Sequence, residues 1–153
     1  MAQARKRTVN VPPVYFLVAL LLMAFFHYVA PAAQLLVAPY RYAGIVLMGL
    51  AIALLVWAAL FFRRAGTGIV PFSPATALVT SGPYRYTRNP MYLGLAGTLL
   101  GAAVLMGSIT PFVVIPAFMA LIADHFIEGE EAMLERSFGS QYLEYKARVR
   151  RWL

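Results

Sequence analysis

Long apolar runs alternate along the chain with short polar breaks that contain arginine, proline or glycine. Two of the runs, roughly residues 13–30 and 42–62, are each long enough to cross a bilayer as a helix rising about 1.5 Å per residue. A third run, from about residue 91 to 123, is too long for one ordinary span, and Gly107 and Pro111 predict a turn inside it. The pattern therefore predicts an all-α integral-membrane helical bundle with about four transmembrane helices.

The composition supports a membrane protein and removes several kinds of chemistry. Of the 153 residues, 61% are hydrophobic and 12% are charged, which is too apolar for a soluble domain and suits a single membrane domain, 1–153. Cysteine is absent, so disulfides, thiolate metal sites and a cysteine nucleophile are excluded, and no metal site is predicted. The net charge of +7 does not indicate nucleic acid, because the basic residues flank the apolar runs instead of covering a soluble face.

The basic residues predict the topology. Those at the ends of the apolar runs are Arg5, Lys6, Arg7, Arg63, Arg64, Arg85, Arg88, Arg148, Arg150 and Arg151. The positive-inside rule then places both termini on the cytoplasmic side, in what we expect to be a bacterial or archaeal inner (plasma) membrane, and leaves only Arg41 near the opposite face. We divide the chain into an N-terminal helical hairpin (1–62), a cytoplasmic loop (63–90), a second hairpin (91–124) and a C-terminal cytoplasmic helical segment (125–153).

Carboxylates are confined to one part of the chain. All six lie between positions 124 and 144, at Asp124, Glu128, Glu130, Glu131, Glu135 and Glu144. The predicted spans contain no acidic residue, and the lone His27 near a helix end is typical of an interfacial position, so a proton-coupled transporter is disfavoured. The adjacent pair Glu130 and Glu131 requires a cationic or hydrogen-bond-donating partner, because two carboxylates beside anionic headgroups repel each other.

The C-terminal segment carries an apolar stripe at three- and four-residue steps, which predicts an amphipathic helix that Gly139 interrupts. The stripe consists of Leu134, Phe138, Tyr142, Tyr145, Val149 and Trp152. One interpretation is a helix that lies on the membrane surface with Arg148, Arg150 and Arg151 facing anionic lipid.

The 63–90 loop is far longer than an ordinary connection, and its aromatic residues and prolines favour a folded segment over a disordered one. Pro90 suits the first turn of the third helix, and Asn89 is placed to cap it. A helix N-terminus favours an anionic group such as a carboxylate. Together with the two glutamates, the loop is predicted to enclose a ligand that carries a carboxylate, a purine and a positive centre.

Small residues recur at four-residue spacing in the third run. Gly97 and Gly101, and then Ala103 and Gly107, place them on a helix face where a neighbouring backbone can approach closely. Helix packing is one interpretation of this face. The other is a portal through which a lipophilic molecule enters from the membrane.

Two motifs and the residues that follow them carry a resemblance. Residues 78–84 read LVTSGPY, residues 88–94 read RNPMYLG, and Glu130-Glu131, Phe138-Gly139, Tyr142, Tyr145, Val149 and Arg151 come after them in order. This pattern resembles the isoprenylcysteine carboxyl methyltransferase family and the related phospholipid methyltransferases. The similarity covers about half of the chain, from Thr76 to Trp152.

The resemblance implies an integral-membrane enzyme that uses S-adenosyl-L-methionine to methylate a lipophilic acceptor at the cytoplasmic membrane face. The cofactor-binding residues that it implies are Thr76, Ala77, Leu78, Val79, Tyr84, Asn89, Pro90, Met91, Tyr92, Glu130 and Glu131. Two positions depart from the eukaryotic pattern: Asn89 stands where those enzymes have histidine, and Phe126 stands where they have a substrate-contacting arginine. The second departure argues against assigning a prenylcysteine carboxylate as the acceptor.

Methyl transfer from a sulfonium needs an aligned nucleophile and exclusion of water, without a metal or a covalent intermediate. An amine or thiol acceptor must also lose a proton, for which His125 and Glu128 are the candidate bases, although His125 equally suits an interfacial histidine. The competing class is a non-enzymatic four-helix membrane scaffold or a transporter. The methyl acceptor and the oligomeric state are left open by the sequence.

Overall fold

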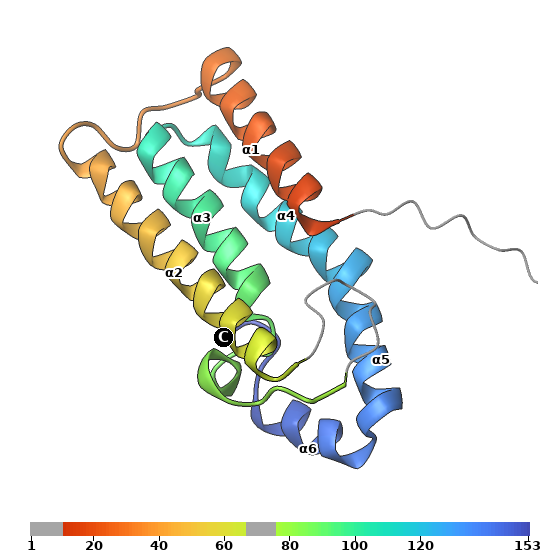
Figure 1. Cartoon of the computed structure of the whole chain (residues 1–153). Coiled ribbons are helices and arrows are strands. Elements are labelled where there is room, and N and C mark those ends of the chain that lie inside the picture. The colour runs from red at the N-terminus through yellow and green to blue at the C-terminus, as the bar shows by residue number, and fades with distance from the viewer. Residues whose placement is uncertain (1–10, 67–75) are drawn as a thin grey trace, which may run out of the picture.

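The computed structural model describes residues 11–66 and 76–153, which form helices joined by short irregular segments (Figure 1). The α-helices are α1 (Pro12–Val29), α2 (Ala43–Arg64), α3 (Pro90–Met106), α4 (Val114–Ile122), α5 (Glu128–Phe138) and α6 (Ser140–Arg148). Short 3-10 turns precede α2, α3 and α4, and a π-turn joins α4 to α5. Residues Arg5, Lys6 and Arg7 and the 67–75 part of the 63–90 loop lie outside the described residues.

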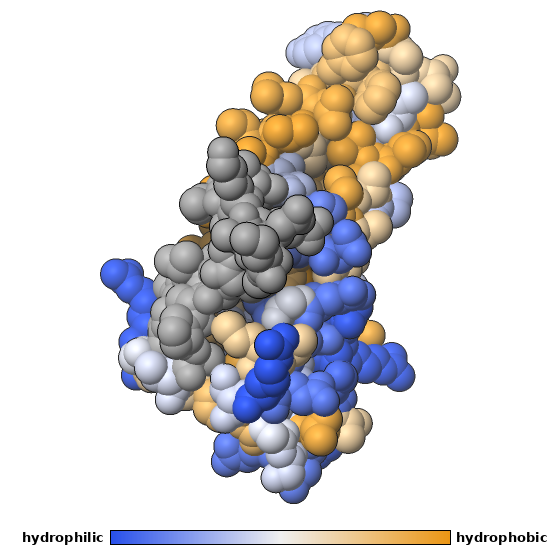
Figure 2. Space-filling model, turned by 90° about the vertical axis from the view of Figure 1, so that its right-hand side faces the viewer, coloured by the Kyte–Doolittle hydropathy of each residue, from blue (hydrophilic) through white to orange (hydrophobic). Residues whose placement is uncertain are grey.

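The predicted membrane bundle is confirmed. Three helical runs are long and apolar enough to cross a bilayer, Pro12–Val29, Tyr40–Arg64 and Thr110–Phe138, and the shorter apolar helix Pro90–Met106 is the fourth. Figure 1 shows α3 between α2 and α4, with α1 packed along α4. On the face shown in Figure 2, apolar side chains cover the upper part of the bundle and polar side chains gather below, where α5 and α6 lie. We call the end that carries α5 and α6 the polar end.

Glycines bring α2 and α3 into backbone contact. A Cβ atom at Gly101 would lie 2.5 Å from Met48 Cγ and 2.8 Å from the carbonyl oxygen of Gly44, and a Cβ at Gly97 would lie 2.9 Å from Ala51 Cβ. The packing interpretation of these small residues is therefore confirmed. The portal interpretation is wrong for the part of α3 that carries Gly97 and Gly101, because α2 covers it.

The predicted turn inside the third apolar run is also present. α3 ends at Met106 and is followed by Gly107, whose φ of +80° favours glycine. The chain from 33 to 36 docks on this turn through hydrogen bonds from the Leu35 and Leu36 amides to the Gly107 carbonyl. His27 Nδ1 lies 2.7 Å from the hydroxyl oxygen of the fully buried Ser108. His27 thus ties the end of α1 to the α3–α4 turn, at the end of the bundle away from α5 and α6.

The C-terminal segment packs against the rest of the protein. α5 ends at Phe138, the break at Gly139, with a φ of +52°, confirms the predicted interruption, and α6 returns beneath the bundle (Figure 1). Tyr142 and Tyr145 are 1% and 5% exposed, and Arg151 bonds to Glu131. The surface-helix interpretation is therefore wrong for these three side chains, because they are used in contacts within the chain.

The α2–α3 contact predicts that alanine substitution destabilises the protein at one glycine of these helices and not at another. Gly101→Ala should destabilise the protein by about 1–3 kcal/mol, because the carbonyl of Gly44 cannot give way to the added carbon. Gly49→Ala, where nothing lies within 4 Å of the added carbon, should be neutral or stabilising by up to about 1 kcal/mol through helix propensity. Unfolding of both variants in detergent measures the difference, and equal shifts would contradict close backbone packing.

Candidate active site

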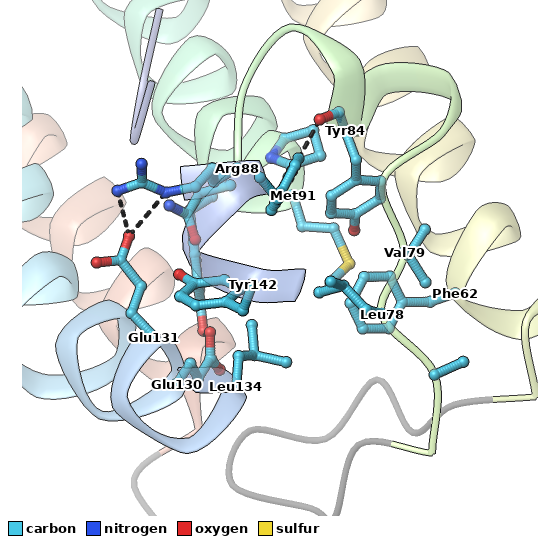
Figure 3. Close-up of a pocket in the computed structure, with 15 residues that line it drawn as sticks. Phe62, Leu78, Val79, Tyr84, Arg88, Met91, Glu130, Glu131, Leu134 and Tyr142 are labelled. Carbon is cyan, nitrogen blue, oxygen red and sulfur yellow. Dashed lines mark hydrogen bonds and ion pairs between the residues drawn. The ribbon is translucent and has the colours of Figure 1, made fainter. Parts of the chain in front are cut away.

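A pocket lies at the polar end, where the end of α2, the segment 77–89, the start of α3, α5 and α6 meet (Figure 3). Its lining residues are Phe62, Ala77, Leu78, Val79, Tyr84, Arg88, Asn89, Pro90, Met91, Tyr92, Glu130, Glu131, Leu134, Tyr142 and Tyr145. The loop before α3 and the paired glutamates, which are about forty positions apart in the sequence, therefore face one space, as predicted.

The segment before α3 is folded by a glycine and two aromatic contacts. Gly82 has a φ of +61° and lies against the ring of Phe61, where an added Cβ would come within 2.6 Å of Cε1. The next residues form a 3-10 turn that buries Tyr84, whose ring lies 5.1 Å from that of Phe62 at the end of α2. The hydroxyl of Tyr145 donates a 2.7 Å hydrogen bond to the Tyr84 carbonyl, so α6 fixes this turn from the other side.

Asn89 occupies the N-cap position of α3, but its side chain makes no capping hydrogen bond, and the predicted cap is therefore wrong. Its amide Nδ2 donates instead to the carbonyl of Arg151 at 3.0 Å, which also accepts a hydrogen bond from the Thr87 hydroxyl at 3.1 Å. The Arg88 amide donates to the Arg150 carbonyl at 2.9 Å. The Asn89 side chain therefore holds the C-terminal segment. It leaves the first turn of α3 without a side-chain cap.

Glu131 is buried and pairs with two arginines, Arg88, which is nearly buried, and Arg151, which is 35% exposed. Its Oε1 accepts hydrogen bonds from Arg88 Nη2 at 2.8 Å and Nε at 3.2 Å (Figure 3). Its Oε2 accepts one from Arg151 Nη2 at 2.9 Å. The remaining Nη1 of Arg88 donates to the Val149 and Lys146 carbonyls. Arg88 is therefore fully engaged within the protein, although it lines the pocket.

Glu130 has a different environment from its neighbour. The hydroxyl of buried Tyr92 donates a 2.9 Å hydrogen bond to its Oε1, and no cation lies within ion-pair distance among the described residues. Successive helical residues are about 100° apart around the axis, so Glu131 turns to the arginines while Glu130 faces the pocket. The pocket therefore contains a carboxylate whose charge is not balanced by the described side chains.

The pocket includes every predicted cofactor residue except Thr76, whose hydroxyl donates to the Gly66 carbonyl at 3.1 Å. Their cofactor roles stay predictions. The sequence prediction missed Phe62, Arg88, Leu134, Tyr142 and Tyr145, which also line the pocket. Tyr142 and Tyr145 belong to the pattern that carries the resemblance and to the periodic apolar stripe, but the stripe was interpreted as the face of a helix on the membrane surface.

The two candidate bases lie outside the lining. His125 Nδ1 is 3.1 Å from the Leu121 carbonyl and 3.2 Å from Asp124 Oδ2, and its ring lies 5.7 Å from that of Tyr15 on α1. Glu128 is exposed, with its Oε1 3.6 Å from Arg151 Nη1. The π-turn before α5 carries His125 on the side of α1, so the geometry of the pocket gives no support to either base.

The cluster of Glu131 with Arg88 and Arg151 predicts a large difference between two glutamates of α5. Glu131→Ala should destabilise the protein by about 3 kcal/mol, because Arg88 is left as a buried unpaired charge. Glu135→Ala removes a half-exposed pair with Lys146 and should cost at most about 1 kcal/mol. Denaturant unfolding in detergent compares them, and similar losses would show that the cluster does not hold the polar end together.

Comparison with known proteins identifies the family of this arrangement. Residues 40–141, about two thirds of the chain, match the sequence model of the family described as Phospholipid methyltransferase. A protein of Haemophilus influenzae described only as uncharacterized is 38% identical over 63 residues, which are 41% of this chain and the whole of that protein. Protein-S-isoprenylcysteine O-methyltransferase of Schizosaccharomyces pombe is 33% identical over 72 residues, which are 47% of this chain and 30% of that protein.

The family match runs from the 3-10 turn before α2 to the start of α6, and so includes most of the elements that line the pocket. It confirms the resemblance that the two motifs indicated. On this evidence the chain belongs to the phospholipid methyltransferase family.

Proposed function

We propose that the protein is a membrane methyltransferase that takes its methyl group from S-adenosyl-L-methionine and transfers it to a lipophilic acceptor at the cytoplasmic membrane face. Membership of the family implies methyl transfer. The observation that carries the rest is the pocket, in which an uncapped helix start, the unbalanced carboxylate of Glu130 and an apolar wall meet.

The residues of the pocket fit this methyl donor. Glu130 suits an ammonium group, since its charge has no cationic partner among the described residues. The first turn of α3 and the buried hydroxyls of Tyr84 and Tyr142, which have no described hydrogen-bond partner, suit its polar groups. Phe62, Leu78, Val79, Met91 and Leu134 offer an apolar surface for a nucleoside.

Methyl transfer requires the protein mainly to position the donor and the acceptor and to exclude water. When bound, the donor supplies an electrophilic methyl group on a sulfonium, which a nucleophile attacks from the opposite side. The aromatic and aliphatic lining residues exclude water and limit the orientations of both reactants, which provides much of the rate in such a transfer. No nucleophile of the protein is required.

The place of the pocket suits a lipophilic acceptor. It lies at the end of the apolar helices, next to the polar segments α5 and α6 (Figure 1). An acceptor dissolved in the bilayer then approaches from the membrane, and the polar donor approaches from the aqueous side. A bacterial or archaeal inner membrane with both termini in the cytoplasm is the setting that this proposal assumes.

Glu130 provides the first test. The wild-type protein in detergent should bind labelled S-adenosyl-L-methionine, and Glu130→Gln should weaken the binding about tenfold or more, because a charge-assisted contact of roughly 1.5–3 kcal/mol is lost. Glu135→Gln, a change on the outer face of the same helix, is the matched control and should bind as the wild type does. Calorimetry gives both affinities.

Two results of that titration would count against the proposal. A wild-type protein that binds no donor would overturn the methyltransferase assignment and favour a scaffold. A Glu130→Gln variant with unchanged affinity would remove Glu130 from the site.

The acceptor is sought with a membrane lipid extract. Incubation with the protein and a donor carrying an isotopic methyl label should produce a labelled lipophilic compound, detected by mass spectrometry. Glu130→Gln should reduce its yield in proportion to the loss of donor binding, and Glu135→Gln should not. A label that appears only in water-soluble compounds would contradict a lipophilic acceptor.

A further inference from the structure

Two phenol hydroxyls in the pocket are buried without a partner. Among the described residues, the side-chain polar atoms that are buried and lack a hydrogen bond are Arg41 Nε, Tyr84 Oη and Tyr142 Oη, and both tyrosines line the pocket. A buried hydroxyl without a partner costs free energy, so such an atom needs a reason. For Tyr142 no role is indicated by the motifs.

The position of Tyr142 is set by packing and not by its hydroxyl. The residue comes from α6 and is 1% exposed. Its ring lies 6.2 Å from that of Tyr145, which is itself anchored by its hydrogen bond to the Tyr84 carbonyl. The hydroxyl is therefore held in place although it contributes no contact to the fold.

The hydroxyl of Tyr142 is a donor at neutral pH. Burial, with a smaller contribution from the charge of Glu131, raises the pKa of Tyr142 to about 12, so the proton stays on the oxygen. No described acceptor lies within hydrogen-bond distance, and both oxygens of Glu131 already accept hydrogen bonds from arginines. An acceptor on a molecule bound in the pocket would complete the hydrogen bonding of this hydroxyl.

The surroundings indicate which part of the ligand supplies it. Figure 3 shows Tyr142 on the side of Glu130 and Glu131, whereas Tyr84 lies across the pocket with Phe62 and Val79. The cluster of Arg88, Glu131 and Arg151 has one more positive than negative charge, although exposed Glu128 screens Arg151 in part. An unbalanced negative charge stands beside it at Glu130. An adjacent positive and negative centre match the carboxylate and ammonium of an amino acid.

We propose that Tyr142 Oη donates a hydrogen bond to the carboxylate of the methyl donor's amino-acid end, while Glu130 holds the ammonium. This inference rests on the proposed function and deepens it. It gives the pocket a direction: the amino-acid end lies between α5 and α6, and the nucleoside end lies against α2 and the segment 77–84. Tyr142 then selects ligands that carry an amino-acid end.

Tyr142→Phe separates a ligand-binding role from a structural one. Because the hydroxyl has no described partner, its removal should leave the melting temperature of the free protein unchanged or raise it. The affinity for S-adenosylhomocysteine, which retains the amino-acid end, should fall about tenfold or more. The affinity for 5′-methylthioadenosine, which lacks that end, should stay the same. Tyr86→Phe, at an exposed tyrosine, is the matched control and should change none of the three values.

Calorimetry with the two ligands on the full chain in detergent decides the inference. Tyr142→Phe with unchanged affinity for S-adenosylhomocysteine would overturn it and leave the proposed function standing. Equal losses for both ligands would also overturn it, because the hydroxyl would then act on the nucleoside end or on the shape of the pocket. A wild-type protein that binds neither ligand would instead overturn the proposed function itself.

Discussion

Glu131 and its two arginines connect three parts of the chain that the helices alone would leave apart. Arg88 belongs to the segment before α3, Glu131 to α5 and Arg151 to the C-terminal segment. Because Arg88 and Glu131 are shielded from solvent, each of these two charges depends on the other, and the carbonyls of Lys146 and Val149 accept hydrogen bonds from Arg88 Nη1. The position of α6 and the shape of the pocket both follow from this cluster.

One consequence is a division of roles between adjacent carboxylates. Glu131 is neutralised within the protein, and Glu130 is left with a single neutral donor, Tyr92. Arg88 is a reasonable anion-binding residue by sequence alone. In the structure its guanidinium group bonds to Glu131 and to the carbonyls of Lys146 and Val149.

The helices could be predicted from the sequence because their signals are local. The length of the apolar runs predicted the spans, Gly107 predicted the turn after α3, and Gly139 predicted the break between α5 and α6. Each of these signals depends only on neighbouring residues. The convergence of the loop and the glutamates followed from charge and from the family motifs. Asn89 was wrongly assigned as a cap, since its actual partner, the Arg151 carbonyl, is 62 positions away. Tyr142 was missed for a similar reason: a periodic apolar face does not reveal whether lipid or protein covers it.

The close contact of α2 with α3 bears on the connection between them. Glycines at this contact hold the two backbones together, so the end of α2 and the start of α3 keep their separation whatever joins them. The entropic cost of a longer connection rises only with the logarithm of its length. The segment 77–89 of this connection lines the pocket, so a change of length is tolerated only before residue 77, and there Phe62 and Met91 would keep the same spacing across the site.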